Sequence, residues 1–178
     1  MSKENASIKK IFDEAFQHYQ NGNLKQAETL FKKVLESIPK HFSSTFLLGT
    51  ISGQIKQYQA AIELLKQAIE INPNYTEAHN NLGNVFQELG KHQEAILSYK
   101  SAININPNFV TAYHSLGNSL QILGKQQEAI ASYQKAININ PNYAEAYHKL
   151  GKIFRKLDKD QEAIASYQKA ININPNYA

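Results

Sequence analysis

The stretch Tyr113–Tyr147 has the sequence YHSLGNSLQILGKQQEAIASYQKAININPNYAEAY, and its landmark residues return along the chain at intervals of 34 residues. The interval is kept by all five prolines, by four of the glycines and by five alanines. These residues are Pro39, Pro73, Pro107, Pro141 and Pro175; Gly49, Gly83, Gly117 and Gly151; and Ala27, Ala61, Ala95, Ala129 and Ala163. A fixed interval of this length is typical of a repeat array, in which each unit packs on the next.

Two helices are predicted in each interval. Proline ends the second helix because it cannot donate the helical hydrogen bond. The asparagine after the proline can begin the next helix, since Asn74…Glu77 and Asn142…Glu145 have the spacing of a capping box. Tyr99, Tyr133 and Tyr167 recur within the second helix, and we expect them to fill the core between repeats.

These landmarks resemble the tetratricopeptide repeat (TPR), a helix–turn–helix unit of 34 residues, from about Ile8 to Tyr177. The resemblance implies an all-α fold, a right-handed TPR solenoid (superhelix) of antiparallel helix pairs with five repeats. The expected boundaries are 1–7 for a disordered N-terminus, 8–41 for a divergent first TPR, and 42–75, 76–109, 110–143 and 144–177 for the others, all in one solenoid domain. Because Ala178 would begin a sixth repeat, we expect the natural array to continue.

Two turns depart from the pattern. Lys56 and Asp158 stand where other repeats have Gly22, Gly90 and Gly124, and glycine is the residue that best tolerates a positive φ at a helix end. Gly53 falls inside the first helix of the second repeat. It indicates either a close approach of two helices or an early helix end, and we favour the close approach.

Several classes of function are excluded by composition. The chain has no cysteine, no secretory signal and no apolar run of membrane-spanning length, so we expect a cytoplasmic protein without a membrane contact. A net charge of +4 without a basic stripe does not indicate nucleic-acid binding. No nucleophile is paired with a base, and the glycines follow the repeat interval, so we expect neither an enzyme nor a cofactor. His114 and His148 occupy equivalent places, and we expect surface polar contacts there and no metal.

The family resemblance implies that the first helices line a concave groove. The N-terminal part of this groove is aromatic, with Phe12, Phe16, Tyr19 and Phe46, although these rings fit equally well into a core of shifted register. The central part is rich in amides, which can donate to and accept from a peptide backbone. The C-terminal part is basic, and it could bind carboxylates or form a solvated face. The predicted peptide-binding residues are Asn80, Asn81, Asn84, Gln87, His114, Asn118, Gln121, His148, Lys149, Lys152 and Arg155.

We therefore predict a scaffold that binds a protein or peptide segment, acidic in part, in its groove. A second hypothesis follows from the Asn-Asn-Leu-Gly-Asn run at 80–84, which resembles the opening TPR arrays of bacterial O-linked GlcNAc transferase-like proteins. In those proteins the repeats recruit substrates for a catalytic domain. A third hypothesis is head-to-tail self-association through Tyr167 and Ile171 of the last repeat, which the chain leaves uncapped.

Overall fold

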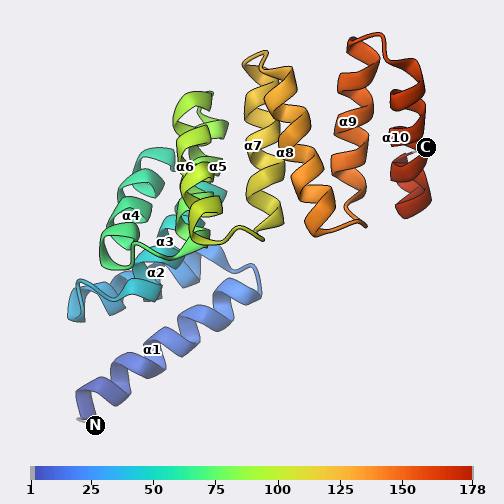
Figure 1. Cartoon of the computed structure of the whole chain (residues 1–178). Helices are drawn as coiled ribbons and strands as arrows, with labels where there is room; N and C mark the ends of the chain where they lie inside the picture. Colours follow the sequence, from blue (N-terminus) through green and yellow to red (C-terminus); the bar gives the residue numbers. More distant parts are fainter. Residues whose placement is uncertain (1–2, 178) are drawn as a thin grey trace. The chain divides into compact units, whose positions relative to one another are not determined.

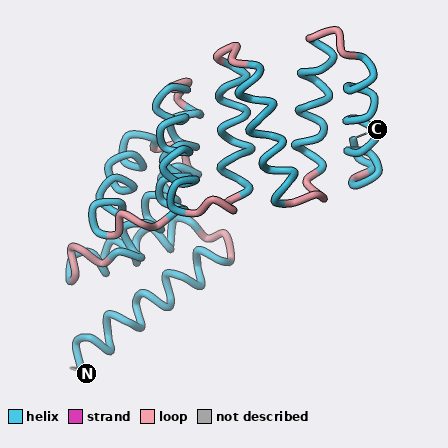
Figure 2. Tube along the Cα trace, viewed as in Figure 1, coloured by secondary structure: helices cyan, strands magenta, loops and turns pink. Residues whose placement is uncertain are grey.

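The computed structural model describes residues 3–177, which form helices joined by short loops and contain no strand (Figure 1 and Figure 2). The α-helices are α1 (Lys3–Gln20), α2 (Leu24–Ser37), α3 (Phe42–Gln54), α4 (Tyr58–Ile71), α5 (Thr76–Glu88), α6 (His92–Ile105), α7 (Val110–Ile122), α8 (Gln126–Ile139), α9 (Ala144–Lys156) and α10 (Asp160–Ile173). A 3₁₀ turn, η1 (Pro175–Tyr177), follows α10. The expected solenoid of helix pairs is confirmed.

The helices fall into two compact units, Met1–Val85 and Phe86–Ala178, with the boundary inside α5. In the first unit α1 pairs with α2, α2 packs on α3, and α3 pairs with α4. In the second unit α6 packs on α7, α7 pairs with α8, α8 packs on α9, and α9 pairs with α10. The right-handed superhelix expected from the family stays a prediction.

Large and small residues alternate in the core of each unit. Tyr99 and Tyr133 are completely buried in the second unit, as predicted, among alanines such as Ala129 and Ala136. In the first unit Phe31 takes a comparable place beside Ala15. The small side chains let neighbouring helices approach closely, so that one large ring fills the space between them.

Glycine is required where the tyrosine ring crosses the first helix. A Cβ on Gly117 would lie 2.7 Å from Cε1 of Tyr133, and a Cβ on Gly151 would lie 2.7 Å from Cδ1 of Tyr167. Gly53 also marks a close approach, because α3 continues through it and its Cβ would lie 3.2 Å from Cγ2 of Val85. The expectation of close packing at Gly53 is confirmed.

The turn inside each helix pair needs a left-handed residue. Gly22, Gly90 and Gly124 have φ values of 74°, 71° and 74°, whereas Lys56 and Asp158 adopt φ values of 63° and 56° in the same place. A residue with a Cβ is strained in this region by about 1 kcal/mol or more. These two turns therefore keep the shape of the glycine turns at a cost in stability.

Two local expectations differ from the structure. Residues 3–7, expected to be disordered, belong to α1, because Lys, Glu and Ala favour helix; residues 1 and 2 lie outside the described residues. Asn142 does not begin α9, since the N-cap is Tyr143, whose side chain makes no capping hydrogen bond. Instead the Asn142 backbone N–H donates to Oδ1 of Asn140 at 3.1 Å, so the asparagine before the proline stabilises the turn.

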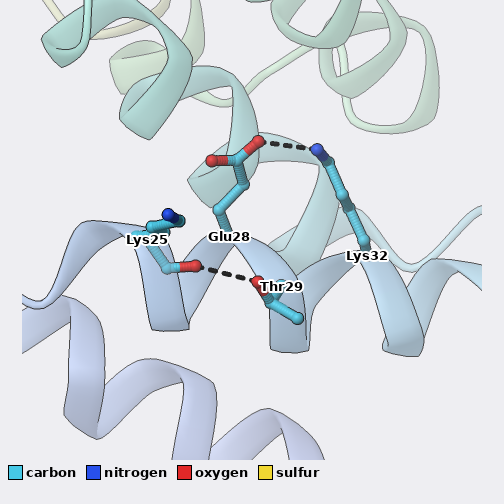
Figure 3. Close-up of polar contacts among 4 residues, drawn as sticks. All are labelled: Lys25, Glu28, Thr29 and Lys32. Carbon is cyan, nitrogen blue, oxygen red and sulfur yellow. Dashed lines mark hydrogen bonds and ion pairs between the residues drawn. The ribbon is translucent and has the colours of Figure 1, made fainter.

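Polar contacts join successive turns of α2 (Figure 3). Lys32 Nζ donates to Glu28 Oε1 at 2.6 Å, and the Thr29 hydroxyl donates to the backbone oxygen of Lys25 at 3.0 Å. Pairs of this kind within one exposed helix contribute a few tenths of a kcal/mol.

None of the helices within residues 3–177 combines the length and the apolar content needed to cross a membrane.

Candidate functional site

A pair of rings recurs at four of the first helices, α1, α3, α7 and α9. The fifth residue of the repeat packs against the residue that precedes the same helix of the next repeat. Ring centroids are 5.1 Å apart for Phe12 and His41, 4.9 Å for Phe46 and Tyr75, 5.2 Å for His114 and Tyr143, and 5.1 Å for His148 and Tyr177. The repeat thus places both predicted histidines in a packing position.

His114 is buried, with 8% of its surface exposed, so the expectation of a surface contact was wrong. Its ring also packs against Tyr133, and its Nε2 lies 3.3 Å from Oε1 of Glu145 without the angle of a hydrogen bond. Burial lowers the pKa of His114, Glu145 opposes this shift, and Lys149 adds to it. His114 is therefore neutral at pH 7, and Glu145, expected in a capping box, lies beside it instead.

The amides of α7 are held by a buried tyrosine from α8. The Tyr133 hydroxyl donates to Oδ1 of Asn118 at 2.8 Å, and its oxygen also lies 3.3 Å from Oε1 of Gln121. Burial raises the pKa of Tyr133, so the hydroxyl keeps its proton and remains a donor. The amide of Asn118 is therefore oriented with its oxygen toward the core, while Gln121 lies beside the same hydroxyl.

Gln87 has the same role at the end of α5. Its Oε1 accepts from the hydroxyls of Tyr99 at 3.2 Å and of Ser119 at 3.1 Å. Both lone pairs of the amide oxygen are thereby used. In the second unit the predicted groove amides Gln87, Asn118 and Gln121 thus all have structural partners.

The amides of the first unit have different environments. Asn81 donates to the Thr50 hydroxyl at 3.1 Å, which in turn donates to the backbone oxygen of Phe46 at 3.0 Å. Asn80 is buried, and its Oδ1 has no hydrogen-bond partner, whereas Asn84 is exposed. Asn80 stands at the same repeat position as His114, so buried polar atoms without a hydrogen bond recur at this position.

The basic residues of α9 follow one another along a side of the helix that is open to solvent. Lys149 is half-buried, whereas Lys152, Arg155 and Lys156 are exposed. Within residues 3–177 none of the four forms an ion pair with a carboxylate. Burial lowers the pKa of His148, Lys152 and Lys149 lower it further, and Glu145 opposes these shifts.

The aromatic residues of the first unit form a pocket of about 230 Å³. Its lining consists of Phe12, Phe16, Phe42, Ser43, Phe46, Leu47 and Tyr75. Phe12 and Phe46 pack on the hydrophobic core, while Phe16 has 37% of its surface exposed. Some of these rings therefore belong to the core and Phe16 lies at an open surface. The sequence had left core and groove lining as alternatives for all of them.

Family models agree with the geometry of the helix pairs. The TPR repeat model matches residues 54–90, 83–124 and 117–158, and the tetratricopeptide repeat model matches residues 144–177. The chain is a tetratricopeptide repeat protein. No curated protein matches it at a significant level.

Solved structures of other TPR proteins resemble the chain over almost its whole length. A crystal structure of MamA has a TM-score of 0.84 at 27% identity and covers 91% of this chain and 95% of its own. MamA 41-end from Desulfovibrio magneticus RS-1 has a TM-score of 0.87 at 17% identity, with coverage of 95% and 96%. YrrB, described as a TPR protein with an unusual peptide-binding site, has a TM-score of 0.78 at 19% identity, with coverage of 98% and 93%.

The predicted groove residues of this TPR protein fall into two sets. Gln87, Asn118 and Gln121 share the contacts with buried tyrosines, and His114 and His148 lie close enough to Lys149 for its charge to lower both pKa values. Asn80, Asn81 and Asn84 belong to the first unit. Within the described residues no three His, Cys, Asp or Glu side chains converge as metal ligands do.

The sequence did not indicate the donors Tyr99, Tyr133 and Ser119 or the carboxylate of Glu145. The tyrosines were expected to contribute only apolar surface. The spacing carried a signal for the hydrogen bond of Tyr133. Asn118 stands 15 residues before Tyr133 and can accept a hydrogen bond from its hydroxyl. Lys152 stands at the same distance before Tyr167 and cannot accept one.

Proposed function

We propose that the chain is a protein-interaction module that binds an extended segment of a partner along the first helices of its repeats. The observation that carries this proposal is the set of basic side chains on α9 that form no ion pair within the described residues. Two of them, Lys152 and Arg155, stand one repeat after the half-exposed amides Asn118 and Gln121 of α7. Surface charges without partners favour association with groups of opposite sign. The peptide-binding site named for YrrB supports the same use of the fold.

The proposed ligand contacts are Asn80, Asn81 and Asn84 in the first unit and Gln87, His114, Asn118, Gln121, His148, Lys149, Lys152 and Arg155 in the second. Asn80 and His114 are buried and would shape the groove, whereas Asn84, Lys152 and Arg155 are exposed and would contact the ligand. A partner with acidic groups fits the positive end best.

A peptide array of extended segments with acidic, neutral and basic side chains tests the proposal directly. We expect selected peptides to bind the wild-type chain and to lose about tenfold or more in affinity to the variant Lys152→Glu/Arg155→Glu, because a favourable charge contact is reversed. The matched control Lys33→Glu/Lys66→Glu makes the same change of charge at exposed lysines of α2 and α4 and should leave affinity unchanged. Absence of any bound peptide, or equal loss in both variants, would contradict the proposal.

Self-association is a second candidate, and one observation favours it. Ile62, Ile96 and Ile130 stand at one repeat position and are 7%, 6% and 9% exposed, whereas Ile164 at the same position is 61% exposed. An apolar side chain that the other repeats cover is thus bare on α10. Light scattering across a concentration series tests this candidate: a mass above 20.1 kDa that returns to the monomer value in Ile164→Lys supports it, and a constant monomer rules it out. The resemblance to glycosyltransferase-like proteins stays a prediction.

A further inference from the structure

We infer that the aromatic pocket of the first unit binds a methylated ammonium group, the chemistry shared by the head of choline and the side chain of trimethyllysine. This site goes beyond the proposed function, because none of the residues that line the pocket is among the proposed peptide contacts. The ligand is a compact organic cation whose surface consists of methyl groups. It is recognised by aromatic rings and by one carboxylate close to them.

The aromatic lining is not required by the repeat. Three repeats further along the chain, the counterparts of Phe12, Phe16, Phe42 and Phe46 are His114, Asn118, Ala144 and His148. Of the five lining rings only that of Tyr75 is kept, by Tyr177. The helices α7 and α8 and the helices α9 and α10 nevertheless form the same pairs. Folding of a helix pair therefore does not explain why four phenylalanines gather in the first unit.

The rings come from two helices and from the residue before a third. Phe12 and Phe16 of α1 are nearly parallel, with centroids 6.3 Å apart and an angle of 9° between their planes. Phe42 and Phe46 of α3 form a second parallel pair, at 6.2 Å and 11°. Tyr75 stands nearly perpendicular to both rings of the second pair, at 82° and 78°, with centroid distances of 4.9 Å. The pocket is thus bounded by rings in two orientations.

The size and chemistry of the pocket suit one compact group. Its volume of about 230 Å³ is below the roughly 300 Å³ at which pockets for drug-sized ligands begin. Phe16 is 37% exposed, so a ligand can reach its ring from solvent. A neutral apolar group gains equally from aliphatic and aromatic walls. A cation gains from rings in particular, because the face of an aromatic ring is negative.

The cations near the pocket are already paired or neutral. No lysine or arginine belongs to the pocket lining. Lys9 lines a neighbouring hollow together with Phe12, and its ammonium lies 3.4 Å from a carboxylate oxygen of Asp13. His41 packs against Phe12, and burial lowers its pKa, so it is neutral at pH 7. A bound cation would therefore not be repelled by these residues.

One carboxylate close to the pocket lacks an ion pair. Glu77 follows Tyr75 by two residues and lies in the first turn of α5. Its side chain is exposed, and within residues 3–177 it forms no ion pair. Burial raises the pKa of Tyr75 and the charge of Glu77 raises it further, as expected for a carboxylate near the phenol. The aromatic pocket is thus accompanied by a negative charge that a cationic ligand can neutralise.

An NMR titration of the full chain tests the inference with two matched probes. The probes are choline and its uncharged isostere dimethylbutanol, in which a carbon atom replaces the nitrogen. We expect choline to bind about tenfold more tightly, with shifts of the amides of the pocket residues, because only the cation gains from the ring faces. A short peptide that contains trimethyllysine identifies the source of the group: tighter binding than choline indicates a protein side chain, and weaker binding indicates a small molecule.

Two variants separate the contributions of the rings and of the carboxylate. Phe16→Leu keeps an apolar wall but removes an exposed ring, so affinity for choline should fall about fivefold while that for dimethylbutanol stays unchanged. Glu77→Gln should weaken choline binding about threefold at low salt, and added salt should reduce this difference. Glu145→Gln is the matched control, because Glu145 stands in the same way two residues after Tyr143 in the second unit, and it should have no effect.

Several results would overturn the inference. Equal affinity for choline and dimethylbutanol would show a pocket that is merely apolar. Absence of binding by both choline and the trimethyllysine peptide would show that the rings only pack. If Phe16→Leu fails to fold, an equal effect of Glu77→Gln and Glu145→Gln is the decisive contradiction. Peptide binding through Lys152 and Arg155 is unaffected by any of these results.

Discussion

The fourth and fifth repeats have nearly the same second helix but surround its tyrosine differently. Tyr133 is completely buried and donates to Asn118, whereas Tyr167 is half-buried and makes no hydrogen bond within the described residues. Residues 123–144 and 157–178 differ at only two pairs, Gly124/Asp158 and Gln126/Asp160. The environment of a side chain in a repeat array thus depends on its own first helix and on the next repeat, more than on its local sequence.

Removing the tyrosine ring should give the largest difference between the two repeats. Tyr133→Ala leaves a cavity among fully buried neighbours and should lower the free energy of unfolding by about 4 kcal/mol, whereas Tyr167→Ala should cost about 2 kcal/mol. Urea denaturation followed by circular dichroism measures both. Equal losses would mean that the two rings contribute alike in spite of their different burial.

Adding a methyl group under the ring should give the next largest difference. Gly117→Ala places a Cβ against the buried Tyr133 ring and should destabilise the protein by about 2 kcal/mol. Gly151→Ala meets Tyr167, which can move toward solvent, and alanine favours the helix, so the loss should stay below about 1 kcal/mol. A thermal melt of each variant provides the comparison, and a greater loss for Gly151→Ala would contradict it.

The exchange of turn residues should have a smaller and reciprocal effect. Asp158→Gly removes left-handed strain and should stabilise by about 0.5 to 1 kcal/mol, while Gly124→Asp introduces it and should destabilise by a similar amount. Urea titrations of both variants measure the change in the free energy of unfolding, which should have opposite signs. Changes of the same sign would show that the surrounding residues, and not φ, determine these turns.

The pH dependence of stability should separate His114 from His148. Burial lowers the pKa of His114 in the folded state, so the unfolded state binds the proton more readily, and stability should be complete above about pH 6.5 and fall below it. Asn80 is the natural counterpart, so His114→Asn should remove part of this acid loss. His148→Asn should remove less, because His148 is more exposed.

Unfolding titrations at pH 7.5 and pH 5.0 measure the effect. The residues around His114 that carry or can acquire charge are Glu145, Lys149, Tyr133 and Tyr143, and burial raises the pKa of Tyr143 to about 12, so both tyrosines stay neutral in this range. His41, whose pKa burial also lowers, contributes to the total loss, so the share of His114 is the part of the acid loss that His114→Asn removes. Equal behaviour of the two histidine variants would contradict the prediction.

The fold was predictable from the sequence because its determinants are repeated. The interval between prolines, the small residues at Ala95 and Ala129 and the glycine opposite Tyr133 each indicate one contact, and each recurs several times. The helix start at Tyr143 was not predictable from capping rules, since Asn142 matches a capping box but lies in a turn held by Asn140. Local rules identified the element there and missed its boundary.

The residue types of the candidate site could be predicted from the sequence, but the contacts between its side chains could not. Asn118 and Gln121 look like exposed amides in the sequence, and their orientation depends on a hydroxyl that arrives from another helix. His114 was expected at the surface because its position in the repeat was assigned to the groove, yet two tyrosine rings pack against it. Long-range contacts of this kind decide which atoms of a side chain remain available, and a single sequence does not display them.

The shared second helix suggests how such a protein can be re-engineered. In α8 and α10 the same tyrosine packs against a glycine of the preceding helix, which is Gly117 of α7 or Gly151 of α9. The first helices α7 and α9 could therefore be exchanged without changing this contact. Inserting another copy of the fourth repeat would lengthen the neutral amide row by one step, and inserting another fifth repeat would lengthen the cationic one. In a family of such insertions, ligand preference would be set by the order of the first helices alone.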